Sequence, residues 1–210
     1  MAAMTDERDD PFEGTIGIIG AGAKGRQIAA YALLGRCRVI LEDISQSRLA
    51  EARSYIAVAL DAALAQEKFP RQNGETGGGT LASLSTMESI NDVARSADFL
   101  IEAAPEDEEL QLEIFTLFDK FAKPEAVLAS TAESISIADL AEMTNCPERC
   151  VGLQFSEPTS LKRAMQIIRA PQTSERTLEL CLRFGHTLGL QPVIVSEAAR
   201  SAGLREARSP

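Results

Sequence analysis

The stretch Thr15–Gly25, TIGIIGAGAKG, decides the fold of this 210-residue chain. It opens with a short apolar run rich in β-branched residues, which is typical of a buried parallel strand. Three glycines follow in the pattern G-x-G-x-x-G, and the residues after them predict a helix. A glycine-rich turn between a buried strand and a helix indicates a Rossmann-type α/β domain that holds a dinucleotide.

The rest of the chain alternates strands with helices, which implies parallel strands joined by right-handed crossovers. We therefore expect a doubly wound, mostly parallel sheet flanked by helices. A loop is expected at the glycine-rich segment Pro70–Thr80. Strands are predicted at Thr15–Gly20, Arg38–Leu41, Thr80–Thr86, Phe99–Ala103, Ala126–Ser130, Cys150–Phe155, Met165–Ile168 and Pro192–Val195. Helices are predicted at Ala23–Leu34, Ser45–Lys68, Glu88–Arg95, Glu108–Phe121, Ser136–Met143 and Ser174–Leu188.

Composition limits the class of protein. With 21 basic and 31 acidic residues the net charge is −10, which argues against a nucleic-acid or anionic-membrane partner. No apolar run reaches the roughly 18 residues of a membrane span, and the acidic start is not a signal peptide, so we expect a cytoplasmic protein. Residues 1–12 are expected as a disordered leader, 13–196 as the Rossmann domain and 197–210 as a polar tail. With four cysteines and one histidine, no metal site is expected.

The glycine loop provides a chemical reason for binding phosphate. Gly20 permits a tight turn, Gly22 lets the backbone approach a pyrophosphate, and Gly25 lets the helix pack closely on the strand. Ala23 and Lys24 complete the loop, where the N–H groups and positive dipole of the helix face the phosphates. Lys24 either adds a cation there or points to solvent. The alternative is a glycine-rich turn that binds nothing.

Asp43 closes the second predicted strand, where a carboxylate can accept hydrogen bonds from both ribose hydroxyls of NAD. The same charge repels the 2′-phosphate of NADP, and Glu42 adds to that preference. The pattern does not separate NAD from FAD. The short chain leaves little room for a flavin domain, so NAD is the expected cofactor.

Five segments, in order, resemble the NAD-binding (N-terminal) domain of 3-hydroxyacyl-CoA dehydrogenases. The resemblance runs from Thr15 to Val195, and it implies NAD contacts at the loop glycines, Asp43, Ala103 and Glu106. Glu106 also has a plain explanation as an acid near a helix N-terminus. The segments are Ile16–Ala30 (IGIIGAGAKGRQIAA), Val39–Ile44 (VILEDI), Phe99–Asp107 (FLIEAAPED), Val127–Ile137 (VLASTAESISI) and Pro147–Pro158 (PERCVGLQFSEP).

The family's catalytic residues are changed in this chain. The resemblance implies oxidation of a 3-hydroxyacyl thioester by a histidine base and its glutamate partner, but these positions carry Gln154 and Gln166. A glutamine amide does not titrate near neutral pH, and loss of a placed base costs about 10²–10⁴ in rate. A family lysine falls on Gln111. His186, late in the last helix, is expected as a surface residue.

Two carboxylates stand at other positions of the family pattern. Glu133 stands where the resemblance implies a substrate-contacting serine, and Glu157 lies three residues after Gln154. Either becomes a candidate base if it is desolvated; otherwise both are solvated acids around an emptied site. The family's helical second domain has no counterpart in residues 196–210, and its helical hairpin is interrupted by Pro70–Thr80.

The resulting expectation is an NAD(H)-binding relative from fatty-acid metabolism that lacks ordinary dehydrogenase activity. Its partners are the dinucleotide and an acyl-CoA or hydroxy-acid ligand, with a homodimer or a separate helical subunit as further options. The alternatives are an active NAD-dependent dehydrogenase that uses a carboxylate base or a separate helical subunit, and an inert scaffold.

Overall fold

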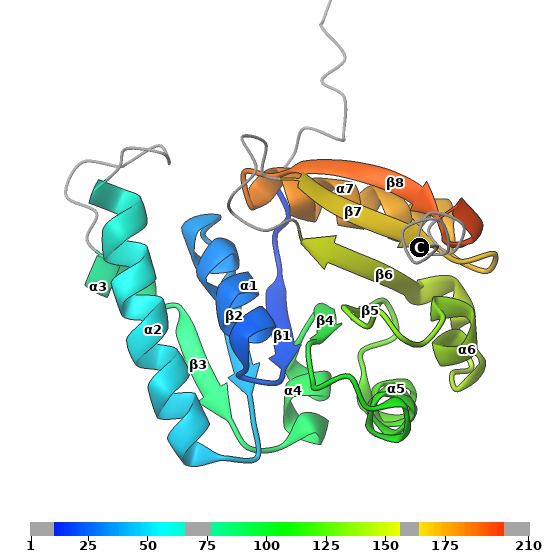
Figure 1. Ribbon diagram of the computed structural model, residues 1–210, viewed down its shortest axis with the longest axis horizontal. Helices are drawn as coiled ribbons and strands as arrows, with labels where there is room; N and C mark the ends of the chain where they lie inside the picture. Colours follow the sequence, from blue (N-terminus) through cyan, green and yellow to red (C-terminus); the bar gives the residue numbers. More distant parts are fainter. Residues whose placement is uncertain (1–10, 66–76, 156–163, 200–210) are drawn as a thin grey trace, which may run out of the picture.

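A computed structural model describes residues 11–65, 77–155 and 164–199. Its eight strands form one sheet in the order β3-β2-β1-β4-β5-β6-β7-β8 (Figure 1). Neighbouring strands from β3 to β6 pair in parallel, β7 is antiparallel to β6, and β8 is parallel to β7. The predicted doubly wound, mostly parallel sheet is thereby confirmed. The strands are β1 (Thr15–Ile19), β2 (Arg38–Glu42), β3 (Leu84–Met87), β4 (Phe99–Glu102), β5 (Val127–Ser130), β6 (Cys150–Phe155), β7 (Ala164–Arg169) and β8 (Gln191–Ser196).

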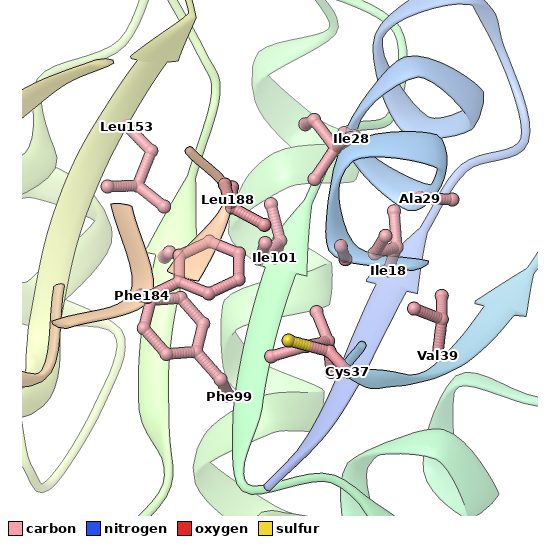
Figure 2. Close-up of a cluster of buried hydrophobic side chains, with 14 of the residues drawn as sticks. Ile18, Ile28, Ala29, Cys37, Val39, Phe99, Ile101, Leu153, Phe184 and Leu188 are labelled. Atoms are coloured by element: carbon pink, nitrogen blue, oxygen red, sulfur yellow. The ribbon is translucent and has the colours of Figure 1, made fainter. Parts of the chain in front are cut away.

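Helices cover both faces of the sheet, and each face has its own hydrophobic core. One cluster joins the sheet to α1 (Ala23–Leu34), α2 (Gln46–Ala65) and α7 (Glu175–Thr187). Figure 2 shows part of this core, with Phe99 and Phe184 in contact at its centre. The other cluster joins the opposite face to α4 (Ile90–Ser96), α5 (Glu108–Phe121) and α6 (Ile137–Glu142).

Four helices begin at a side chain that caps them. Ser89, Asp107, Ser136 and Ser174 each accept a hydrogen bond from the backbone N–H three residues later. Such caps satisfy N–H groups that have no partner within the helix. They explain why the chain leaves its loops and enters α4, α5, α6 and α7 at these residues.

The segment Gly77–Leu81 differs from expectation. It was predicted to be part of a loop followed by a strand from Thr80, but it forms the short helix α3, and β3 begins only at Leu84. Packing of α3 against α2 outweighs the poor helix propensity of its three glycines. The remainder of the predicted loop, residues 70–76, lies outside the described residues.

The ends of the described chain pack against the domain. Phe12, assigned to the leader from the sequence, is buried with its ring edge against Phe99 and Phe184. The packed fold therefore includes a residue before the expected boundary at residue 13. Glu197, expected in the tail, accepts hydrogen bonds from the backbone N–H groups of Ile137 and Ala138 at the start of α6. Within the described ranges, no helix is both long enough and apolar enough to cross a membrane.

The sheet order creates the place for a site. From β1 the chain moves to β2 on one side, and after β3 it returns to β4 on the other side of β1. The loops that follow β1 and β4 therefore diverge, leaving a crevice at the carboxyl ends of the strands. The glycine loop, Asp43, Glu106 and Glu133 all follow the carboxyl ends of parallel strands at this edge.

Candidate dinucleotide-binding site

The glycine loop is tight on its inner side and open on its outer side. Gly20 has a φ of 103°, in the left-handed region that favours glycine. A Cβ at Gly25 would lie 1.8 Å from the carbonyl oxygen of Gly20, so that position has no room for a side chain. At Gly22, by contrast, a Cβ would meet nothing within 4 Å. The three glycines thus allow the turn, the close packing of α1 and an uncovered backbone, as predicted.

The N-terminus of α1 is left without a side-chain partner. Gly22 is the N-cap, no side chain caps the helix, and its first turn contains no acidic residue. No side chain of the helix itself therefore neutralises the positive end of the dipole. This arrangement fits an anionic group such as a pyrophosphate.

Asp43 connects the glycine loop to the end of β2. Its side chain is buried: Oδ2 accepts a hydrogen bond from the Ala21 N–H (3.1 Å), and Oδ1 accepts one from the Ser45 N–H (3.0 Å). A carboxylate has about four acceptor positions, so two remain for a ligand. Beside Asp43 lies a cleft of about 510 Å³, within the usual range for ligand pockets. Its walls come from β1, β2, α4 and α5, with apolar contributions from Ile44, Ile90 and Leu110.

Lys24 does not simply point to solvent, which was one of its two predicted placements. Its Nζ donates to Glu106 Oε1 (2.9 Å), Glu133 Oε1 (3.3 Å) and the carbonyl of Thr131 (3.2 Å). Partial burial lowers the pKa of Lys24, but its contacts with Glu106 and then Glu133 raise that pKa above its ordinary value. Lys24 is thus a cation that joins the first turn of α1 to the loops after β4 and β5.

Glu106 organises the loop that follows β5. Besides Lys24, its carboxylate accepts hydrogen bonds from the N–H of Glu133 (3.1 Å) and from the N–H (3.3 Å) and hydroxyl (2.9 Å) of Ser134. Partial burial raises the pKa of Glu106, but the hydrogen bonds from Lys24, Glu133 and Ser134 lower it to about 2. The position predicted to contact the cofactor is therefore also a structural centre of the site.

We expect Glu106→Gln to lower the free energy of unfolding at pH 7 by about 1 kcal/mol or less, because the site is half exposed and screened by solvent. The folded-state pKa of about 2 lies below the ordinary glutamate value. The stabilisation is therefore complete above an ordinary pKa near 4.3 and is lost as the pH falls toward 2. Urea unfolding at pH 7 and pH 3 measures it. Glu113→Gln, at an exposed position in α5, is the control, and an equal loss at both pH values would contradict the prediction.

A second pocket, of about 290 Å³, lies beside Lys24. Gln27 and Ile28 of α1 form one wall, and Leu153, Gln154 and Phe155 of β6 form another, while Thr131 and Glu133 come from the loop after β5. The structure therefore brings together the predicted site residues Lys24, Glu133 and Gln154.

Gln154 and Gln166 are register partners in the antiparallel pair of β6 and β7. Directly opposed residues in such a pair have their Cβ atoms about 4.5–5.5 Å apart. The two positions that the resemblance assigns to a catalytic pair are therefore neighbours, but both carry amides. Neither amide can accept and release a proton near neutral pH.

The structure describes one of the two carboxylates that were considered as substitute bases. Glu133 is 63% exposed and paired with Lys24, so it is not the desolvated carboxylate that a substitute base requires. Glu157 lies outside the described residues. His186, the only histidine, is exposed in the last turn of α7, as predicted.

Glu102 is a site residue that the sequence analysis missed. It is fully buried at the end of β4, where it accepts hydrogen bonds from the Ser130 hydroxyl (2.6 Å) and the Ala104 N–H (2.7 Å). Burial raises its pKa, although these two hydrogen bonds act in the opposite direction. The feature of the sequence that could have identified Glu102 is a glutamate at the end of an apolar strand, FLIE. Glu102 joins the ends of β4 and β5 beneath the site.

Two further predicted positions are buried. Ala103 follows Glu102, and its carbonyl oxygen would lie 2.7 Å from a Cβ placed at Gly20, so it packs directly against the glycine loop. Gln111 in α5 donates to the Pro105 carbonyl (3.4 Å). Its Oε1 has no hydrogen-bond partner within the described part of the chain.

Comparison with known proteins places these features in a family. Residues 15–198 match the family model described as 3-hydroxyacyl-CoA dehydrogenase, NAD binding domain. The chain is 34% identical over 179 residues to the mitochondrial hydroxyacyl-coenzyme A dehydrogenase of Sus scrofa, covering 84% of this chain and 57% of that protein. It is 37% identical over 182 residues to a 3-hydroxybutyryl-CoA dehydrogenase of Bradyrhizobium diazoefficiens, covering 87% and 60%.

Solved structures of dehydrogenases have the same fold as this chain. The (S)-3-hydroxybutyryl-CoA dehydrogenase of Ralstonia eutropha superposes with a TM-score of 0.77 at 30% identity, covering 87% of this chain and 63% of that one. The 3-hydroxybutyryl-CoA dehydrogenase of Escherichia coli K12 gives 0.78 at 30% identity, covering 87% and 38%. The chain thus spans less than two thirds of the length of these relatives.

Proposed function

Because the chain belongs to the 3-hydroxyacyl-CoA dehydrogenase family and matches its NAD-binding domain, we propose that it binds NAD(H) but lacks the ordinary dehydrogenase activity of the family. The observation that carries the binding proposal is the open turn at Gly22, which starts an uncapped helix beside the cleft at Asp43. The sequence also predicts this cofactor. Lys24 does not fill the cleft at Asp43, because its ammonium contacts Thr131, Glu106 and Glu133.

The residues present fit each part of the dinucleotide. The backbone N–H groups of the glycine loop would hold the pyrophosphate, and the free acceptor positions of Asp43 would hold the adenosine ribose. The apolar cleft walls, including Ile44 and Ile90, suit the adenine. The pocket lined by Lys24 and Gln154 would receive the nicotinamide end. When bound, the nicotinamide would accept or donate hydride.

The proposed loss of activity rests on two side chains. Gln154 and Gln166 keep the cross-strand placement of a proton-transfer pair, but neither amide titrates in the working range of an enzyme. The exposed, ion-paired Glu133 does not replace them. The described residues of the site can therefore hold a dinucleotide, but none of them is a base placed to remove a hydroxyl proton from a substrate.

Calorimetry and thermal unfolding with NAD⁺, NADH and NADP⁺ test the binding proposal. A ligand at 100 times its Kd adds about 2.7 kcal/mol to the free energy of unfolding. We expect that stabilisation with NAD⁺ and NADH, and little with NADP⁺ at the same concentration. We also expect no NADH oxidation with acetoacetyl-CoA. Absence of any shift with either form of NAD would overturn the binding proposal, and turnover would overturn the proposed inactivity.

A further inference from the structure

The cleft contains a second acid beside Asp43. Glu42 is the last residue of β2, is 5% exposed and lines the cleft. Alternation along β2 places Val39 and Leu41 in the core beneath α1 and α2, and Ile40 in the core beneath α4 and α5. Glu42 shares the face of Ile40 because side chains two residues apart in a strand point the same way.

Apolar side chains flank Glu42 within the sheet. Its register partners are Ile19 in β1 and Met87 in β3, and both belong to the apolar cluster on the α4 face. Ile90 at the start of α4 lines the same cleft. A carboxylate among such neighbours has lost much of its hydration, which disfavours its ionised form.

The charges around Glu42 also disfavour ionisation. Asp43 is its neighbour in the chain, and the cleft walls add Glu88 and one cation, Arg48. Glu88 accepts a hydrogen bond from Gln46 (2.7 Å). The cleft thus contains three acids against one base before any phosphate enters it.

Among the described residues, no charged side chain of α1, α2 or α4 other than Arg48 lines the cleft beside Glu42. In α2, Arg53 donates to the Leu84 carbonyl (3.4 Å). In α4, Arg95 is paired with Asp92 (3.1 Å). In α1, Lys24 is paired with Glu106 and Glu133, and Arg26 lies over the ring of Tyr55. The strands β1 and β3 contain no charged residue.

These surroundings favour the protonated form of Glu42. Burial and then the charge of Asp43 raise the pKa of Glu42 to about 7, against the smaller opposing effect of the Gly20 N–H. A dinucleotide adds two negative phosphates at the adjoining glycine loop and removes more water from the cleft. Both changes act against the ionised carboxylate.

We propose that the dinucleotide binds preferentially to the form of the protein in which Glu42 carries a proton, so that binding takes up a proton and weakens above neutral pH. This inference rests on the proposed NAD(H) binding and assigns a proton linkage to that same site. The proton balance follows from linkage: for each dinucleotide bound, the Glu42 carboxylate takes up from solvent a fraction of a proton equal to the rise in its protonated fraction.

The size of the effect follows from linkage. If binding raises the carboxyl midpoint by one pH unit, the affinity for NAD⁺ falls roughly fivefold between pH 6 and pH 8. Isothermal titration calorimetry at several pH values measures the affinity. Titration at pH 7 in phosphate and in Tris, which differ in ionisation enthalpy, measures proton uptake directly.

Glu42→Gln is the test variant because it keeps the shape and removes the titration. We expect its NAD⁺ affinity to be independent of pH and close to that of the unaltered protein at pH 6. Glu42→Leu, which suits the apolar neighbours, should also be pH-independent, and it serves if the glutamine variant does not fold. Glu88→Gln, an acid in the same cleft, should keep the pH dependence.

The outcomes separate this inference from the proposed function. NAD⁺ binding without proton uptake, or with the same pH dependence in Glu42→Gln, overturns the inference and leaves the binding proposal standing. Failure of NAD⁺ to bind at every pH overturns both. Proton uptake that disappears in Glu42→Gln and persists in Glu88→Gln supports it.

Discussion

Replacing Asp43 by alanine is expected to weaken NAD⁺ binding about 10²- to 10⁴-fold. The two ribose hydroxyls would lose hydrogen bonds to a charged acceptor, each of which contributes about 1.5–3 kcal/mol, and about 1.4 kcal/mol corresponds to a tenfold change in Kd. The same change removes the negative charge that opposes a 2′-phosphate. NADP⁺ should therefore lose much less affinity than NAD⁺, or gain some. Titration calorimetry with both dinucleotides measures the ratio.

The control must separate a ribose contact from collapse of the loop, because Asp43 also binds the N–H groups of Ala21 and Ser45. A collapsed loop would abolish binding of both dinucleotides, whereas a lost ribose contact would mainly affect NAD⁺. Asp43→Asn keeps one oxygen for a backbone N–H and should fall between the alanine variant and the unaltered protein. Unchanged NAD⁺ affinity in Asp43→Ala would show that the ribose contact is wrongly assigned.

The sheet and the phosphate loop could be predicted because each depends on local sequence. The buried strand and the three glycines fix the backbone conformation of the loop. The acid that closes the next strand fixes the position of a negative charge. The short helix at Gly77–Leu81 could not be predicted in this way, because its formation depends on packing against α2 and not on its own residues.

The side-chain network around the site was harder to predict from the sequence than the fold was. Lys24 lies in the first turn of α1, and Glu106 and Glu133 lie in loops far from it in the chain. Only the sheet order brings the Lys24 ammonium within 2.9–3.3 Å of the two carboxylates. Their individual positions were predicted, but the ion pairs that join them were not. The burial of Glu42 and Glu102 was likewise hidden, because a glutamate at the end of a strand can point to solvent or into the cleft.

The double change Gln154→His and Gln166→Glu is expected to raise the rate of NADH-dependent reduction of acetoacetyl-CoA about 10²- to 10⁴-fold over the unaltered protein, the contribution of a placed proton donor and base. The two positions already oppose each other across β6 and β7, and Gln154 lines the pocket beside Lys24. The glutamate would orient the imidazole and stabilise its protonated form. Single-turnover assays with the protein in excess over acetoacetyl-CoA measure this rate.

The pH profile separates restored catalysis from a general change of the pocket. In the direction of reduction the imidazolium donates a proton, so the rate of the double variant should fall as the pH rises through the histidine pKa, ordinarily near 6.5. Gln27→His places an imidazole in the same pocket from α1, without a carboxylate partner across the sheet, and should gain far less. If the double variant binds NADH but reacts no faster than Gln27→His, the missing proton-transfer pair is not what limits this site. The proposed loss of activity would then need a cause outside β6 and β7.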